Sequence, residues 1–130
     1  MRCYRWMSIF SLGLLIGCTK QGGGEKYTPP ETTARQALET ALARWRDGQA
    51  KPAQFPLGKV KVEVVDQAWT DGQKIQSFEI QGEESGGSGP RVFTVKLTSV
   101  KGEQTVKYYV LGIDPLWIYA EPDYRKLSGA

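Results

Sequence analysis

The amino-acid sequence predicts an α+β domain in which one N-terminal helix packs on a four- to five-stranded antiparallel meander sheet. Two observations support this expectation. Between residues 34 and 45, apolar residues recur at three- and four-residue spacing, which is typical of an amphipathic helix. After residue 59 the spacing changes to two, and turn signals separate several such runs.

The helix is expected to begin near Thr28 and to end near Gly48. Thr28 is a residue type that caps helices, Pro29 suits the first helical position, and Glu31 stands where a capping box places its carboxylate. Gly48 suits the left-handed conformation that often follows a helix. The expected apolar stripe consists of Ala34, Ala37, Leu38, Ala41, Leu42 and Trp45.

Two strands are expected before the glycine-rich segment that begins at residue 82. An irregular connection covers residues 48–58, because it holds two prolines. The first strand covers residues 60–69 and the second covers residues 74–81. The Asp71-Gly72 pair predicts a turn that joins them as a hairpin.

The remaining strands follow a loop at residues 82–90. Alternating apolar residues predict a third strand around residues 93–97 and a fourth around residues 106–110. A break at residues 114–115 precedes a short final strand at residues 116–119. The side chains expected in the core are Leu38, Leu42, Trp45, Val60, Val62, Val64, Phe78, Ile80, Phe93, Val95, Leu97, Val106, Tyr108, Val110 and Trp117.

The first 17 residues have the character of a signal peptide. The chain has 130 residues and a net charge of +3, and Arg2 and Arg5 place two of its 17 basic residues in this segment. The apolar stretch that follows, residues 6–16, is too short to span a membrane but matches the apolar region of a signal peptide. Without the segment, 15 basic residues face 14 acidic ones. A net charge of +1 gives no electrostatic reason to expect nucleic-acid binding.

This segment ends in Leu15-Ile16-Gly17-Cys18, which resembles the lipobox of bacterial lipoproteins. The resemblance implies cleavage between Gly17 and Cys18. It also implies that Cys18 is diacylated through its sulfur and acylated at its new N-terminus. Two or three acyl chains make a membrane anchor effectively permanent. An ordinary secretory signal with a chance cysteine, or a buried N-terminal helix, is the alternative interpretation.

The resemblance also implies a cellular location for the protein and a division of the chain into segments. The protein would be anchored by lipid to the cell membrane on its extracytoplasmic side. In a cell with two membranes, Thr19 in place of an aspartate favours the periplasmic face of the outer membrane. The expected units are a signal peptide at residues 1–17, a flexible tether at 18–27, a globular domain at 28–120 and a polar C-terminal tail at 121–130.

The order of one helix followed by meandering strands resembles the cystatin fold and, less closely, the NTF2-like proteins. Inhibitory cystatins carry a Gln-x-Val-x-Gly hairpin. Here Gln104-Thr105-Val106-Lys107 is followed by Tyr108, and the motif lies inside an expected strand. This departure argues against a cysteine-protease inhibitor. An NTF2-like fold can hold an acid–base pocket, which keeps a weak enzyme among the alternatives.

The sequence lacks the residues that most catalytic and metal sites need. It contains no histidine. Cys3 would leave with the signal peptide and Cys18 would be blocked by lipid, so without a free Cys or a His no zinc, iron or copper site of the usual ligand types is expected. Ser88 lies in Gly-Gly-Ser-Gly-Pro, which does not match a nucleophile elbow. We therefore expect no enzyme, no cofactor and no bound metal.

Two carboxylates stand out as candidate site residues. Asp66 falls on the apolar face of the first expected strand. It would be functional with a raised pKa there, unless the strand has already ended or a bulge turns it outward. Asp114 precedes Pro115 and is expected to be a turn residue. A pocket between helix and sheet that holds either carboxylate would favour a small-molecule binder or a weak enzyme.

Aromatic side chains provide the candidate interaction surface, which comprises Trp69, Tyr109, Trp117 and Tyr119. Trp69 and Tyr109 fall on the strand face opposite the predicted core, and Tyr and Trp dominate binding hot spots. Alternatively, these side chains are scattered, are buried by sheet curvature, or belong to the edge of the core.

The leading hypothesis is therefore a lipid-anchored cell-envelope module that binds another protein or an envelope component. Its expected partners are the membrane, through the N-terminal lipid, and an envelope protein, with no nucleic acid. A small-molecule binder or weak enzyme and a purely structural lipoprotein are the alternatives.

Overall fold

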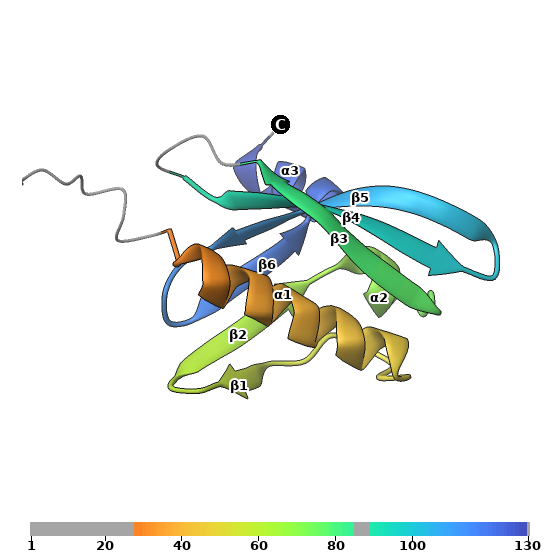
Figure 1. The fold of residues 1–130 in the computed structure, drawn as a ribbon, viewed down its shortest axis with the longest axis horizontal. Coiled ribbons are helices and arrows are strands. Elements are labelled where there is room, and N and C mark those ends of the chain that lie inside the picture. Colours follow the sequence, from red (N-terminus) through yellow and green to blue (C-terminus); the bar gives the residue numbers. More distant parts are fainter. Residues whose placement is uncertain (1–27, 85–88, 130) are drawn as a thin grey trace, which may run out of the picture.

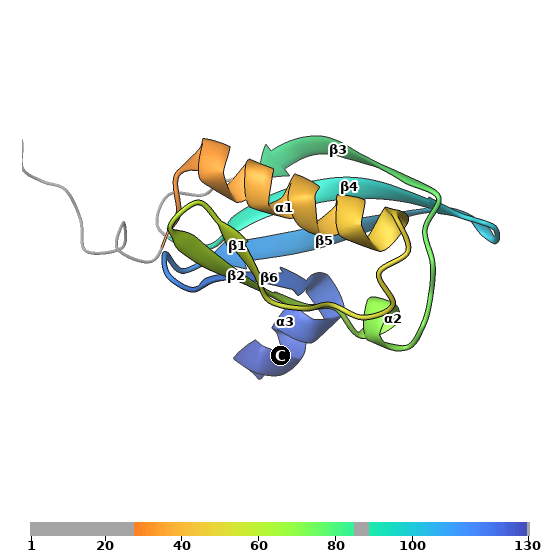
Figure 2. The same cartoon turned by 90° about the horizontal axis from the view of Figure 1, so that it is seen from below.

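The computed structural model describes residues 28–84 and 89–129. This part of the chain is a mixed α+β domain built on one sheet (Figure 1). Helix α1 lies across one face of the sheet and helix α3 lies on the opposite face (Figure 2). None of the helices in the described residues is long and apolar enough to cross a membrane.

Helix α1 (Glu31–Arg46) carries the predicted apolar stripe, and all six of its residues are buried. The helix begins later than predicted, because Pro30 occupies the N-cap position and Thr28 does not cap it. The Thr28 hydroxyl instead donates a hydrogen bond to the carbonyl oxygen of Gly89, at 2.7 Å. Gly48 follows the helix with a φ of 107°, which agrees with the predicted end.

The sheet contains six strands in the described residues, in the order β1-β2-β6-β5-β4-β3. Strand β6 pairs in parallel with β2, and the other neighbouring pairs are antiparallel. The α+β class and the helix-on-sheet layout agree with the prediction. The predicted four to five strands and the all-antiparallel meander are wrong. The strands are β1 (Phe55–Leu57), β2 (Val60–Val65), β3 (Ser77–Glu84), β4 (Arg91–Ser99), β5 (Gly102–Leu111) and β6 (Leu116–Ala120).

The predicted connection at residues 48–58 contains the additional strand. Phe55 pairs with Val62 of β2, and its side chain is buried in the core. Arg44 of α1 lies over the Phe55 ring, with the guanidinium carbon 4.6 Å from the ring centre. Contacts with α1 and β2 therefore order a segment whose prolines predicted an irregular connection.

The predicted hairpin at Asp71-Gly72 is also wrong. Strand β2 ends at Val65, and Gln67–Thr70 form the short helix α2. Asp66 caps this helix, since its carboxylate accepts hydrogen bonds from the backbone N–H groups of Ala68 and Trp69. The chain then crosses to the far edge of the sheet, where β3 pairs with β4 and not with β2.

Strand β6 lies in the middle of the sheet, between β2 and β5. Its inward side chains, Leu116 and Ile118, are fully buried against the α1 side of the sheet. Trp117 and Tyr119 point to the opposite face and are half-buried. The prediction that Trp117 is a core residue is therefore wrong, because the inward register of β6 falls on Leu116 and Ile118.

The segment expected to be a polar C-terminal tail contains helix α3 (Glu121–Ser128). Acidic residues lie in its first turn and basic residues in its last turn, the arrangement that the helix dipole favours. Gly129 ends it with a φ of 81°. The helix contacts β5 and β6, so it covers part of the outer face of the sheet.

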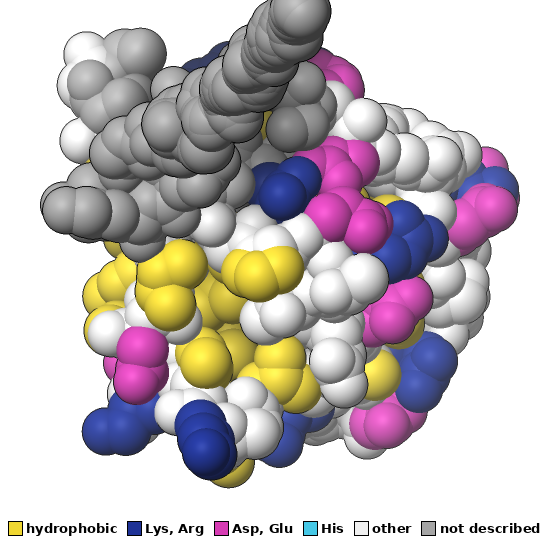
Figure 3. Space-filling view, turned by 60° about the vertical axis from the view of Figure 1, so that its left-hand side comes forward, with side chains coloured by type: hydrophobic (Ala, Val, Ile, Leu, Met, Phe, Trp, Pro, Cys, Tyr) yellow, Lys and Arg dark blue, Asp and Glu magenta, His cyan; other side chains and the backbone are white. Residues whose placement is uncertain are grey.

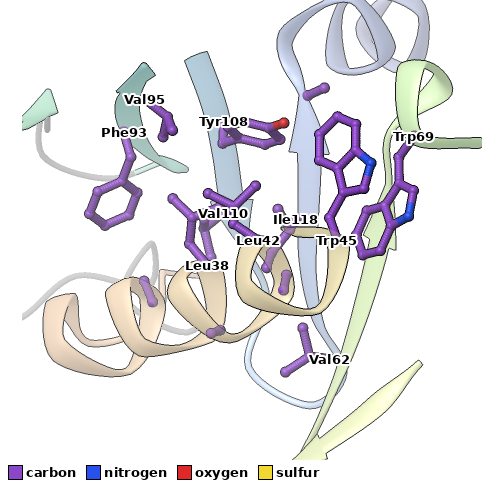
Figure 4. Close-up of a cluster of buried hydrophobic side chains, with 14 of the residues drawn as sticks. Leu38, Leu42, Trp45, Val62, Trp69, Phe93, Val95, Tyr108, Val110 and Ile118 are labelled. Atoms are coloured by element: carbon purple, nitrogen blue, oxygen red, sulfur yellow. The ribbon is translucent and has the colours of Figure 1, made fainter. Parts of the chain in front are cut away.

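The core fills the space between α1 and the sheet (Figure 4). Trp45 of α1 and Trp69 of α2 stack with ring centroids 5.3 Å apart and planes 11° from parallel. Each indole N–H donates to a backbone carbonyl at 2.7 Å, from Trp45 to Gln73 and from Trp69 to Gln49. Both rings are thus buried without an unsatisfied polar group. The stacked pair holds the end of α1, α2 and their connections together.

We predict that Trp69→Ala lowers the free energy of unfolding by about 3–5 kcal/mol, because it leaves a cavity beside Trp45 and orphans the Gln49 carbonyl. Trp117→Ala is the matched control. It removes a half-buried ring from the outer face and should cost about 1 kcal/mol. Urea unfolding followed by circular dichroism measures both values. Equal losses in the two variants would contradict this account of the core.

Candidate functional site

Four aromatic side chains gather on the outer face of the sheet, opposite α1. Tyr109 of β5 and Trp117 and Tyr119 of β6 were predicted as candidates, and Tyr124 of α3 joins them. We call these four residues the aromatic surface. All four are half-buried, so each ring keeps part of its area open to solvent.

The rings of the aromatic surface contact one another in a continuous series. Tyr109 and Tyr119 are direct partners in the antiparallel register of β5 and β6. Tyr124 stacks on Tyr109 with centroids 4.2 Å apart, and its edge meets Tyr119 at 6.2 Å. Trp117 stacks on Tyr119 at 5.7 Å. Because the rings support one another, their orientations are set before any partner arrives.

Charged groups border the aromatic surface on the α3 side. The Tyr109 hydroxyl donates to the Glu121 carboxylate at 3.4 Å, and Arg125 forms an ion pair with the same carboxylate at 3.2 Å. Partial burial and the negative charge of Glu121 raise the pKa of Tyr109. Tyr109 therefore stays a neutral hydrogen-bond donor at neutral pH. The result is an apolar centre with a polar border, as in protein–protein interfaces.

Trp69 does not belong to this surface. It was predicted to project from the strand face opposite the core, but it lies on α2 and only 1% of its area is exposed. The prediction assumed that strand alternation continues to residue 69, but β2 ends at Val65 and Trp69 lies in α2. Trp69 is a core residue, and the candidate surface loses one of its four predicted members.

Tyr124 was missed because residues 121–130 were expected to be a tail. The acidic residues at 121 and 123 and the basic residues at 125 and 126 are a helical charge pattern that sequence inspection could have used. No local signal indicates which face of the sheet this helix covers.

Among the described residues, Asp66 is the only charged residue that is buried, with 3% of its area exposed. Besides capping α2, its carboxylate accepts a 2.7 Å hydrogen bond from the Tyr108 hydroxyl. Burial raises the pKa of Asp66, and the hydrogen bond from Tyr108 opposes that rise. Burial and the neighbouring Asp66 charge raise the pKa of Tyr108 well above its usual value. The strand has ended at this point, as one alternative expected, but the side chain turns inward.

Asp114 differs from Asp66 in both its role and its environment. It is exposed in the β5–β6 turn and accepts a 3.1 Å hydrogen bond from the backbone N–H of Lys61. It is thus the turn residue that the sequence predicts. Neither carboxylate lines the cavities described below, and close-packed apolar side chains fill the space between α1 and the sheet.

A groove of about 380 Å³ lies at the opposite end of the domain from Asp114. Its walls come from the α2–β3 connection, including Gln73 and Lys74, and from Val100 and Lys101 of the β4–β5 turn. Val100 is 85% exposed. Two smaller cavities, of about 90 and 160 Å³, share Gln73 and Lys74 with the groove. We call the 380 Å³ cavity the distal groove.

Within residues 28–84 and 89–129, no three side chains of His, Cys, Asp or Glu lie together as a set that could hold a metal ion. The predicted lipidation residue Cys18 and the cleavage site at Gly17 lie outside the described residues. The chain matches no protein-family model, no curated protein and no solved structure.

We predict that acidification stabilises the wild-type protein relative to Asp66→Asn. A carboxyl whose pKa is raised by folding binds more protons in the folded state, so its stabilising contribution is complete below the ordinary pKa of 3.8 and is lost as pH rises through the folded value. Urea unfolding between pH 7 and pH 4 measures the difference.

Tyr108→Phe provides the second arm of this experiment. It removes the hydrogen bond that holds the pKa of Asp66 down, so the pH-dependent interval should extend to higher pH. Parallel pH profiles for the wild type and Asp66→Asn would show that the carboxyl does not titrate differently on folding.

Proposed function

We propose that this chain is a lipid-anchored protein of the cell envelope that binds another envelope protein through the aromatic surface. The observation that carries the proposal is the second cluster of aromatic rings, on the face of the sheet that the core does not use. The core on the α1 side is complete without Tyr109, Trp117, Tyr119 and Tyr124. Stability alone therefore does not explain why four large rings meet on the outer face.

The physical properties of these rings suit protein recognition. Tyr and Trp supply large contact areas with few rotatable bonds, so little side-chain entropy is lost on binding. Their mutual stacking reduces that loss further. Glu121 and Arg125 at the border can select a partner by charge. An aromatic centre with a charged border fits a protein partner better than a lipid or a nucleic acid.

The membrane part of the proposal rests on the lipobox resemblance at residues 15–18. A domain held at a membrane by lipid needs no spanning helix. Its near-neutral charge after cleavage also leaves the anchor, and not electrostatic attraction, as the reason for membrane residence.

A small-molecule binder is the second candidate, and the distal groove is the observation that favours it. The predicted pocket between helix and sheet is filled by core side chains, but the distal groove has a volume of about 380 Å³. Lys74 and Lys101 stand on its walls, which suits an anionic ligand. For a weak enzyme, the described walls of the distal groove offer polar groups but no buried acid or base. A purely structural lipoprotein is the third candidate, and it would need neither surface.

The anchor is tested by mass spectrometry of the protein purified from its own membranes. The wild type should begin at Cys18 and carry the mass of two or three acyl chains. Cys18→Ser should keep its signal segment and carry no lipid. A wild-type protein without lipid would refute the anchor.

The interaction surface is tested by site-specific photo-cross-linking in cells. We predict that a benzoylphenylalanine at position 117 traps a defined envelope protein, and that the adduct weakens several-fold in a Tyr119→Ala background. The control places the same probe at position 100, which is 85% exposed and lies at the other end of the domain.

The two probe positions separate the alternatives. The same adducts at both positions would indicate non-specific encounters and contradict the aromatic surface. A defined adduct only at position 100 would move the binding site to the distal groove. No adduct at either position would favour the structural lipoprotein.

A further inference from the structure

We infer that the β5–β6 turn, with Ile113 at its tip, rests on the lipid bilayer to which the chain is anchored. This inference rests on the proposed lipid anchor and adds the orientation of the domain on the membrane. The turn comprises residues 112–115. It adjoins the aromatic surface at Trp117, whose Cδ1 would lie 3.6 Å from a Cβ atom on Gly112, while the surface itself lies on the outer face of the sheet.

The chain enters the folded domain at the end that carries this turn. Thr28 is hydrogen-bonded to Gly89, and the Arg91 side chain donates to the Pro29 carbonyl at 2.6 Å. Arg91 is the register partner of Val110 in β5. The β5–β6 turn begins two residues beyond Val110. The entry point and the turn therefore share one end of the domain, on the left in Figure 1.

The length of the tether brings this end close to the membrane. Nine residues, 19–27, separate the anchoring cysteine from Thr28, and three of them are glycines. For the flexible tether that the sequence predicts, a length of nine residues corresponds to a root-mean-square reach of roughly 15–18 Å. Strands β4 and β5 have nine and ten residues, which puts their connecting turn about 30 Å from the entry point. The near end thus lies within the usual reach of the anchor, and the distal groove lies at the other end of β4 and β5, about 30 Å farther along the domain.

The near end presents an apolar surface to the bilayer. Ile113 is 42% exposed at the tip of the turn, and Pro115 beside it is also exposed. Figure 3 looks onto this end of the molecule and shows hydrophobic side chains gathered below the residues drawn in grey. An exposed branched side chain next to other apolar groups is unfavourable in water and favourable at the boundary between headgroups and acyl chains.

Basic residues accompany the apolar tip. The β1–β2 turn lies beside the β5–β6 turn, since the Lys61 backbone N–H donates to Asp114. This places the exposed side chains of Lys59 and Lys61 near Ile113. Lysines around an apolar tip can reach phosphate groups while the tip enters the interface. The combination fits a bilayer with anionic lipid.

The β5–β6 turn is built to hold Ile113 outward. Gly112 has a φ of 85°, and a Cβ atom at this position would lie 2.7 Å from the Pro115 carbonyl oxygen. Only glycine allows the chain to turn this tightly. Together with the Lys61–Asp114 hydrogen bond, this geometry keeps the tip in one orientation.

The test uses nitroxide labels on the acylated protein. Processing removes Cys3 and blocks Cys18, so a new cysteine is the only free thiol of the mature chain. Ile113→Cys labels the near end. Val100→Cys is the matched control at the far end, where the native side chain is also an exposed branched apolar residue. Each protein is reconstituted into liposomes of phosphatidylcholine and phosphatidylglycerol.

Power-saturation electron paramagnetic resonance then measures collisions of each label with a water-soluble nickel chelate. We expect a several-fold lower nickel accessibility at position 113 in liposomes than in detergent, and no change at position 100. A third label at Lys59→Cys should be protected as well, and Ile113→Asp should reduce that protection. Equal accessibility at positions 113 and 100 in liposomes would overturn the inference.

The anchor and the orientation fail in different ways. If mass spectrometry finds no lipid on Cys18 and the protein does not float with the liposomes, the anchor is refuted, and the orientation is refuted with it. If the protein is acylated and floats but position 113 stays open to the nickel chelate, only the orientation is refuted.

Discussion

The buried carboxylate of Asp66 joins the end of β2 and the start of α2 to Tyr108 of β5. It ends β2, caps α2 and accepts the Tyr108 hydroxyl from the centre of the sheet. A buried carboxylate is costly unless its hydrogen-bond capacity is used, and three donors use it here. These bonds hold the chain after β2 in a helix and direct Trp69 toward Trp45. Without them, the segment that crosses from β2 to the far edge of the sheet would lose its fixed starting point.

The same arrangement explains why the domain has two different faces. The stacked indoles of Trp45 and Trp69 close one end of the core under α1, and β6 lies at the middle of the sheet with Leu116 and Ile118 facing inward. Alternation along β6 then sends Trp117 and its neighbouring tyrosine to the outer face. The aromatic surface is therefore a direct consequence of the core register, and its polar border comes from α3.

Much of the core was predictable because periodicity is a local property. The helix stripe and the inward residues of β4 and β5 follow from spacings of three to four and of two. The register of β6 was not, because both alternating sets on that strand are apolar or aromatic. The candidate surface was predicted for Tyr109, Trp117 and Tyr119, but Trp69 was wrong and Tyr124 was missed. Trp69 lies in α2 and Tyr124 lies in α3, and the position of each helix depends on its tertiary contacts and not on local sequence.

Sequence alone was sufficient to specify the α+β class, the amphipathic helix, the inward faces of β4 and β5 and the absence of histidine, because these depend on composition and on neighbours along the chain. It also contains the lipobox-like residues that the anchor hypothesis uses. Tertiary structure decided the six-strand order, the parallel pairing of β2 with β6 and the burial of Asp66 with Tyr108. The β2–β6 pairing and the Asp66–Tyr108 hydrogen bond join residues more than 40 positions apart, and their free energy exists only once the partners are assembled.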